Sequence, residues 1–150
     1  MTSIVDVLYE LKYNPFEYGA YFASFYTVVD GLDNNLLLAP LIIPLCSHPI
    51  FRPKILKSNI KSTIWSIFDD RTKLYDLQER INEFQVLTEQ SIQYCLVNDW
   101  LFVDEQNLSL LRYDYCASNF TKQKSAEKLG RLFSDHTVVE IYAFLGVKPQ

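Results

Sequence analysis

The stretch SAEKLGRLFSDHTVVEIYAFLGVKP, residues 125–149, predicts two short amphipathic helices. The first, from about Lys122 to Asp135, carries apolar residues three and four positions apart, so one face should be buried. Gly130 lies inside this helix and costs about 1 kcal/mol relative to alanine, which favours close packing against another helix. The residues expected on the buried face are Ala126, Leu129 and Phe133.

Both ends of the second helix are specified by the sequence. Thr137 and Glu140 occupy the N-cap and N3 positions of a capping box, which would satisfy free amides of the first turn. Gly146 suits the position just past the helix, and Pro149 prevents its continuation. Such a helix is expected to dock, either on its own core or on another protein. Its apolar stripe consists of Val138, Ile141, Tyr142 and Leu145.

Length and composition indicate one compact domain. The chain has 150 residues, of which 49% are hydrophobic and 15% aromatic. This apolar content exceeds what one core needs and suggests an interface with a partner. The longest apolar run, 36–46, contains two prolines and falls short of the ~20 residues of a membrane helix. Because the N-terminal stretch also lacks the basic segment of a signal peptide, we expect a cytoplasmic protein that does not enter a membrane.

The cysteines and histidines do not form a recognisable reaction centre. Cys46, Cys95 and Cys116 are odd in number and widely spaced among apolar residues, which predicts buried thiols in a reducing compartment. His48 and His136 are interpreted as a turn residue and a polar residue between two helices. The sequence contains no zinc, hydrolase or phosphate-loop motif. It therefore predicts a protein that is not an enzyme and holds no cofactor or metal.

Charge is unevenly distributed along a chain whose formal net charge is −4. One basic group follows residue 50, and a second lies in the 122–135 helix, where positions 124, 128 and 131 share a face. Two interpretations remain open: ordinary solvated faces, or a basic patch that binds DNA or an acidic partner. The residues of the second interpretation are Lys54, Lys57, Lys61, Lys122, Lys124, Lys128 and Arg131.

An aromatic-rich helix is predicted from Asn14 to Gly31. Asn14 can cap the free amides, Pro15 suits the first helical position, and Glu17 completes a pattern like a capping box. Gly31 suits the position just past the end. Apolar side chains cover most of the circumference, so this helix should be central to the fold or contact a second chain.

Two further short helices are predicted at 36–46 and 62–68. Pro44 lacks the amide that a central strand would donate, so a buried helix is favoured over a strand for the first segment. Pro49 and Pro53 predict a turn after it. The second helix is expected to bury Ile64, Trp65 and Phe68.

A long apolar stripe with helical spacing predicts one helix or a pair of helices from about Arg71 to Asn98. Thr88 could cap a new helix, so a break is expected near it. Asp69 and Asp70 are expected to cap the start, where carboxylates offset the helix dipole.

A β-hairpin is predicted at about 100–112, because two runs of strand-forming residues flank a polar turn at 104–107. A helix that leads into a hairpin and is followed by another helix is typical of a winged-helix domain. The predicted fold is therefore mostly α with a small β-hairpin, a winged-helix-like single domain. It comprises a helical core at 14–98, the hairpin, and C-terminal helices at about 122–146.

Several segments follow one another in a recognisable order along nearly the whole chain. They are Asn14-Pro15 before the aromatic helix, LLLAPLIIPLCSHP at 36–49, STIWSIF at 62–68, the passage 91–112, SAEKLGRLF at 125–133 and IYAFLGVKP at 141–149. In this order they resemble the middle component of bacterial three-component ABC-ATPase systems. That group is related to the small subunit of Lamassu-type anti-phage SMC complexes.

The resemblance implies a non-enzymatic adaptor subunit of an anti-phage or anti-plasmid defence complex. Its implied partners are an SMC- or ABC-type ATPase that senses DNA and an effector, often a nuclease, with DNA reached through the complex. The alternative is a winged-helix regulator that binds DNA directly through the basic residues. The residues predicted to bind partners, with core and interface left open, are Phe22, Phe25, Tyr26, Leu129, Phe133, Ile141, Tyr142 and Leu145.

Overall fold

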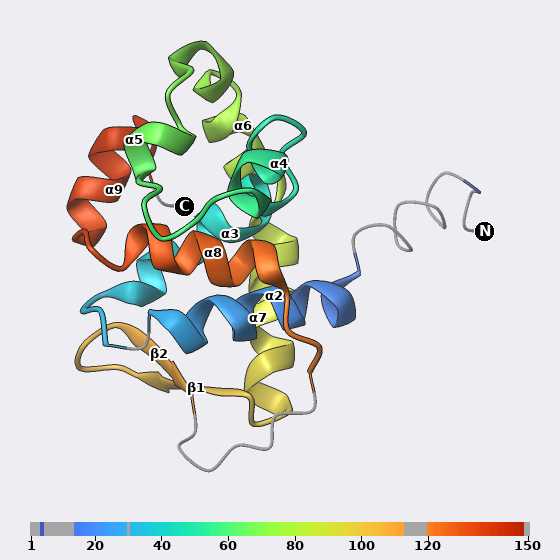
Figure 1. The fold of residues 1–150 in the computed structure, drawn as a ribbon. Helices are drawn as coiled ribbons and strands as arrows, with labels where there is room; N and C mark the ends of the chain where they lie inside the picture. Colours follow the sequence, from blue (N-terminus) through green and yellow to red (C-terminus); the bar gives the residue numbers. More distant parts are fainter. Residues whose placement is uncertain (1–3, 5–13, 30, 113–119, 149–150) are drawn as a thin grey trace.

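A computed structural model describes residues 4, 14–29, 31–112 and 120–148 (Figure 1). The fold is mostly helical with one antiparallel two-stranded hairpin, and this order is compatible with a winged-helix-like arrangement. The elements are α2 (Pro15–Val28), η1 (Asn35–Leu38), α3 (Ala39–Cys46), α4 (Phe51–Leu56), α5 (Ile64–Ile67), η2 (Arg71–Leu74), α6 (Leu77–Glu83), α7 (Gln85–Val97), β1 (Leu101–Asp104), β2 (Ser109–Arg112), α8 (Lys124–Phe133) and α9 (Val138–Leu145).

Helix α2 lies at the centre of the molecule, between α7 and α8, with the hairpin below it in Figure 1. Its start is as predicted, because the Asn14 side chain accepts a hydrogen bond from the Phe16 amide and Pro15 occupies the first position. Its end was predicted too late. The helix stops at Val28, before Gly31, and the carbonyl of Val29 accepts from the Asn35 side chain at 2.8 Å and from the Leu32 amide at 3.1 Å.

Two glycines allow α2 to approach its neighbours closely. A methyl group on Gly130 of α8 would come within 3.1 Å of the Phe25 carbonyl oxygen and of Val28, so close helix packing at Gly130 is confirmed. On the other side, a methyl group on Gly19 would lie 2.7 Å from the Tyr94 ring of α7. The second contact was not predicted, because helical spacing does not reveal which neighbour a glycine faces.

The hairpin is confirmed, with Phe102 opposite Leu111 in register. Buried Asn35 joins it to the helical part. The Asn35 side-chain oxygen accepts from the Leu110 amide at 2.7 Å, and its amide donates to the Leu110 carbonyl at 3.2 Å. These bonds satisfy the outer edge of β2 much as a third strand would, so the position of the hairpin is fixed.

The proline-rich segments are helical. Helix is confirmed for 36–46, which forms η1 and α3 with Pro44 inside α3. The turn predicted from Pro49 and Pro53 is wrong in part, because Pro53 lies in the first turn of α4. Proline is tolerated there since amides of the first turn have no helical acceptor.

The helix pair predicted at 71–98 is present, but the boundaries differ. A turn of 3-10 helix, capped by Asp70 as predicted, precedes α6, and the break falls at Phe84 instead of Thr88. Phe84 is buried, and the Arg80 guanidinium lies over its ring at 5.5 Å. The break between α6 and α7 therefore coincides with a residue whose side chain points into the core.

Of the three residues predicted to be buried at 62–68, Ile64 and Phe68 are buried and Trp65 is not. Thr63 and Ser66 form a capping box that starts the helix at Ile64. Ile64, Ile67 and Phe68 then face the core, whereas the Trp65 side chain is 57% exposed. The prediction that Trp65 is buried is therefore wrong.

The C-terminal helices pack on the rest of the chain. The Thr137 hydroxyl accepts from the Glu140 amide, and Gly146 ends α9 with a φ of +71°. Beyond the helix, Gln78 of α6 bonds both the amide and the carbonyl of Lys148, at 2.7 and 3.1 Å. Helix α9 therefore docks on its own domain, the first of the two alternatives that the sequence left open.

Candidate partner-binding surface

The aromatic and aliphatic residues predicted to bind partners lie in the core. Phe25 of α2 and Phe133 of α8 pack edge to face with ring centroids 6.2 Å apart. These side chains are covered by neighbouring elements of the same chain, whereas Phe16 at the start of α2 is 64% exposed. The eight buried residues are Phe22, Phe25, Tyr26, Leu129, Phe133, Ile141, Tyr142 and Leu145.

Two of the predicted DNA-binding cations are used inside the chain. The Lys54 ammonium forms an ion pair with Asp69 at 2.8 Å. The Lys128 ammonium donates to the carbonyl oxygens of Leu56 and Ser58, at 2.6 and 3.0 Å. Lys128 therefore holds the loop after α4 against α8, and this contact leaves it one of its three donors.

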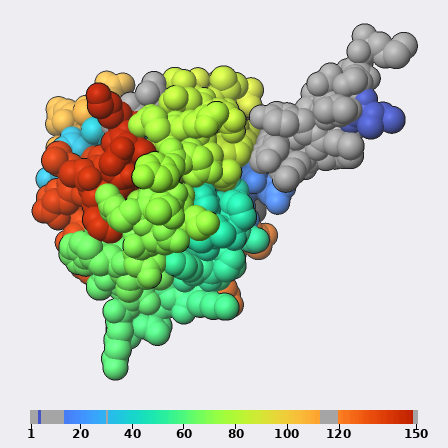
Figure 2. Space-filling model, turned by 90° about the horizontal axis from the view of Figure 1, so that it is seen from above, coloured from blue at the N-terminus to red at the C-terminus, as the bar shows by residue number. Residues whose placement is uncertain are grey.

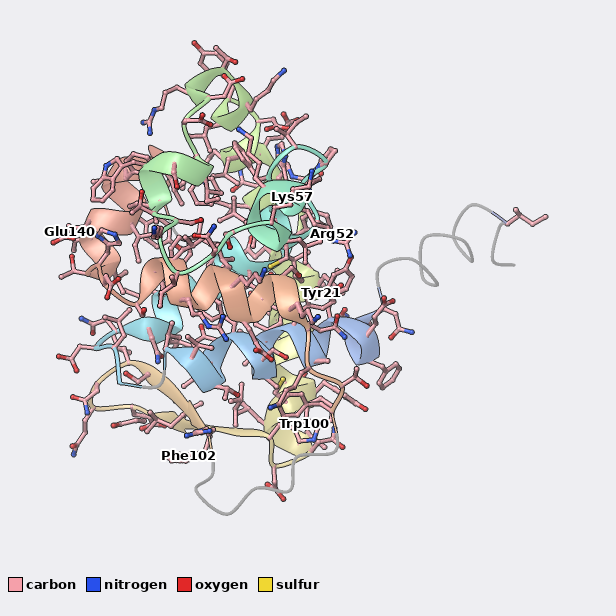
Figure 3. The ribbon with its side chains drawn as sticks, viewed as in Figure 1. Tyr21, Arg52, Lys57, Trp100, Phe102 and Glu140 are labelled. Atoms are coloured by element: carbon pink, nitrogen blue, oxygen red, sulfur yellow. The ribbon has the colours of Figure 1, made fainter. Side chains whose placement is uncertain are left out.

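The other predicted cations divide between two places. Because α4 packs on α8, Lys57 and Lys61 lie in the loop that crosses the half of α8 bearing Arg131. Figure 3 labels Lys57 near α4, above Arg52. Lys122 and Lys124 lie at the opposite end of α8. Arg131 therefore lies beside the loop that carries Lys57 and Lys61, whereas Lys122 and Lys124 are at the far end of the helix.

A tight turn after α4 presents a fully exposed isoleucine. The Asn59 amide bonds the Ser62 hydroxyl at 2.9 Å, the Lys61 amide bonds the Asn59 side chain at 2.9 Å, and the Ser62 amide bonds the Asn59 carbonyl at 3.0 Å. Ile60 at the tip of this turn is 100% exposed. In Figure 2 the segment around residues 57–62 forms the green projection at the lower edge.

A surface pocket of about 360 Å³ adjoins this turn. Ile60 lies on one side, Leu132 of α8 is buried at the base, and Arg131 and Asp135 contribute charges of opposite sign. The pocket therefore combines an apolar base with a polar rim, the usual composition of a binding site.

Trp65 extends this surface toward α9. Its ring lies 5.1 Å from the His136 ring and 6.2 Å from the Phe144 ring, both edge to face. The Arg71 guanidinium lies over Phe144 at 4.8 Å. Since His136 directly follows Asp135, the aromatic group continues from the pocket. We call the exposed side chains of Lys57, Ile60, Lys61, Trp65 and Arg131 the Ile60–Trp65 surface.

His48 has a structural role beyond that of a turn residue. Its Nδ1 accepts from the amides of Ile50 and Phe51 at the start of α4, at 3.1 and 3.3 Å, and its Nε2 lies 3.5 Å from Asp76. Burial lowers the His48 pKa, nearby Arg80 lowers it further, and Asp76 partly opposes this shift. Neutral His48 therefore caps the helix that carries the basic loop.

The cysteine prediction is confirmed for Cys46 and Cys95, which are both buried; Cys116 lies outside the described residues. Burial raises the pKa of each of these thiols to about 12. A protonated, buried thiol is a poor nucleophile and a poor metal ligand. Within the described ranges, no three His, Cys, Asp or Glu side chains gather as they would around a metal ion.

The tip of the hairpin carries carboxylates. Asp104 accepts hydrogen bonds from the Gln106 and Asn107 amides, and Glu105 beside it is exposed. Like charge would repel a phosphate backbone here, so this tip is unsuited to the role of a DNA-contacting wing.

None of the helices in the described part of the chain is both long and apolar enough to cross a bilayer. Searches of curated proteins and of solved structures returned no match to the chain. The model of the family described as ABC-three component (ABC-3C) system Middle Component 3 matches residues 2–149. Because the match covers nearly the whole sequence, this chain belongs to the Middle Component 3 family of ABC-three component systems.

Proposed function

We propose that this protein is a non-enzymatic adaptor that links an SMC- or ABC-type ATPase to an effector, with a nuclease as the expected effector. The observation that carries the proposal is the family match over residues 2–149, which assigns the chain to a multi-component ABC system. We further propose that the complex acts in anti-phage or anti-plasmid defence in the cytoplasm, and that it is related to Lamassu-type complexes.

The surface of the molecule supports a binding role. Trp65 and Ile60 remain exposed although the core is well filled, and exposed aromatic and apolar groups beside arginine are typical of protein interfaces. The buried thiols and neutral His48 are engaged in packing and capping. These features support the proposal of a binding role.

The test is co-expression of the tagged protein with the ATPase and effector encoded beside it. We expect all three to co-elute in size-exclusion chromatography, and the ATPase and effector to separate when the middle component is omitted. A monomer that co-purifies with neither partner would contradict the proposal.

Direct DNA binding is the second candidate, favoured by exposed Lys57 and Lys61 on a loop that passes Arg131. Three phosphate contacts would give a slope of about −3 in log affinity against log salt concentration. Fluorescence anisotropy with duplex DNA between about 50 and 200 mM salt measures this slope. The net charge of −4 and the acidic hairpin tip weigh against this function.

A further inference from the structure

We infer that the Ile60–Trp65 surface is the docking site for an acidic segment of the ATPase or of the effector, one that carries an apolar side chain between carboxylates. This inference rests on the proposed adaptor function and names the surface that performs it. It concerns side chains that the sequence analysis assigned to DNA, to the core or to no role.

The first part of the argument is the shape of the turn. Hydrogen bonds from three backbone amides fix residues 59–62, and Lys128 holds the carbonyl oxygens of Leu56 and Ser58 against α8. Ile60 is therefore presented by a turn whose conformation is defined by hydrogen bonds. Exposure of its whole side chain to water is unfavourable, so a partner that covers it gains affinity.

The second part is the pocket beside the turn. A side chain inserted into the approximately 360 Å³ pocket would contact Ile60 and the buried Leu132. The Arg131 guanidinium at the rim offers a forked set of donors suited to a carboxylate. A partner that pairs an apolar side chain with a neighbouring acid fits both features.

The third part is the aromatic group around Trp65, which lies at the start of α5, after the turn. Trp65, 57% exposed, is fixed edge to face against His136 and Phe144. Tryptophan and arginine are among the residue types enriched in binding hot spots. Here Arg131 lines the pocket, and Trp65 follows shortly after the turn that carries Ile60.

Charge decides between a protein and a nucleic acid. Lys57, Lys61 and Arg131 favour an anionic partner, but Asp135 lines the same pocket and would repel phosphates. A phosphate backbone would also leave Ile60 and Trp65 without apolar contacts. A polypeptide can vary its charge from residue to residue and so satisfy all five side chains.

The experiment measures the dissociation constant of the purified protein for whichever subunit co-purifies with it. We expect Ile60→Asp and Trp65→Ala each to weaken binding by about 30-fold, the size of a hot-spot effect. Val97→Asp is the matched control, because Val97 is 74% exposed on α7, away from the pocket. It should leave the dissociation constant unchanged.

A charge test accompanies the apolar variants. The double variant Lys57→Glu, Lys61→Glu should weaken binding by about 10-fold or more and reduce its dependence on salt. Lys122→Glu changes one exposed cation at the other end of α8 and should have little effect. Because these side chains are exposed, thermal melts of the variants should match the wild type.

The outcomes separate the inference from the function on which it rests. If the wild-type protein binds neither subunit, both the adaptor function and this docking site are overturned. If the wild type binds a subunit and Ile60→Asp binds it equally well, the docking site is overturned while the adaptor function stands. If Ile60→Asp loses affinity for duplex DNA and keeps its affinity for both subunits, the surface binds nucleic acid and the inference is overturned.

Discussion

Helix α2 and the stretch 57–65, which runs from the end of α4 into α5, differ in how deeply their apolar side chains are buried. Helix α2 has aromatic residues around most of its circumference, yet Phe22, Phe25 and Tyr26 are fully buried. The stretch 57–65 is short and mixed in character, yet it exposes Ile60 and Trp65. In this comparison, the segment with many aromatic residues supplies the core, whereas the segment with few apolar residues among cations exposes them on the surface. An interface is better sought in the second pattern than in the first.

The largest change in the free energy of unfolding is expected for a substitution in α2. Phe25→Ala should lower the free energy of unfolding by about 3–5 kcal/mol, because it leaves a cavity between α2 and α8. Urea denaturation measures the loss. A change below about 1 kcal/mol would show that Phe25 is not a core residue and would break the comparison.

A smaller loss is expected where α8 meets α2. Gly130→Ala gains about 1 kcal/mol of helix propensity but places a methyl group 3.1 Å from the Phe25 carbonyl oxygen. A backbone oxygen in a packed helix cannot easily move, so overpacking should win, with a net loss of about 1–2 kcal/mol. Gly31→Ala is the control, since nothing lies within 4 Å of the added methyl group. In thermal melts, the melting temperature should be lower for Gly130→Ala than for Gly31→Ala.

A pH-dependent effect on the free energy of unfolding is expected at His48, which accepts hydrogen bonds from amides at the start of α4. The folded-state pKa is lowered below its ordinary value of 6.5, so the unfolded chain binds the proton first. The stabilisation is fully present above pH 6.5 and is lost as the pH falls through the lower, folded-state pKa. His48→Asn retains an acceptor near Nδ1 but does not titrate. Chemical denaturation from pH 7.5 to 5 should show a shallower decline for this variant.

The smallest effect on stability is expected at Trp65. Because its side chain is 57% exposed, Trp65→Ala should cost less than about 1 kcal/mol of unfolding free energy, while the loss in partner affinity is large. Urea denaturation beside the binding assay checks this. A stability loss comparable to that of Phe25→Ala would place Trp65 in the core and remove the contrast.

The features that were predicted correctly from the sequence are those that depend on residues close together in the chain. Asn14 and Thr137 act as caps, Gly146 ends a helix, and the hairpin lies where strand formers flank a polar turn. Each of these features is set within one turn of chain, so local chemistry is enough.

The remainder depends on contacts across the fold. Buried Asn35 bonds Leu110 of the hairpin, 75 residues away, and the Trp65 ring packs against His136 and Phe144. The pocket that Ile60 shares with Arg131 requires α4 to pack on α8. No periodic pattern carries that information, so neither the pocket nor its cations could be assembled from the sequence alone.

The two hydrogen bonds from Lys128 have a kinetic consequence. They hold the turn that carries Ile60 in one position before any partner arrives. A partner then loses little entropy in ordering this loop, and association should proceed near the ordinary protein–protein rate of about 10⁵–10⁷ M⁻¹s⁻¹. Lys128→Met, which keeps the aliphatic stem, should slow the on-rate by adding a search among loop conformations.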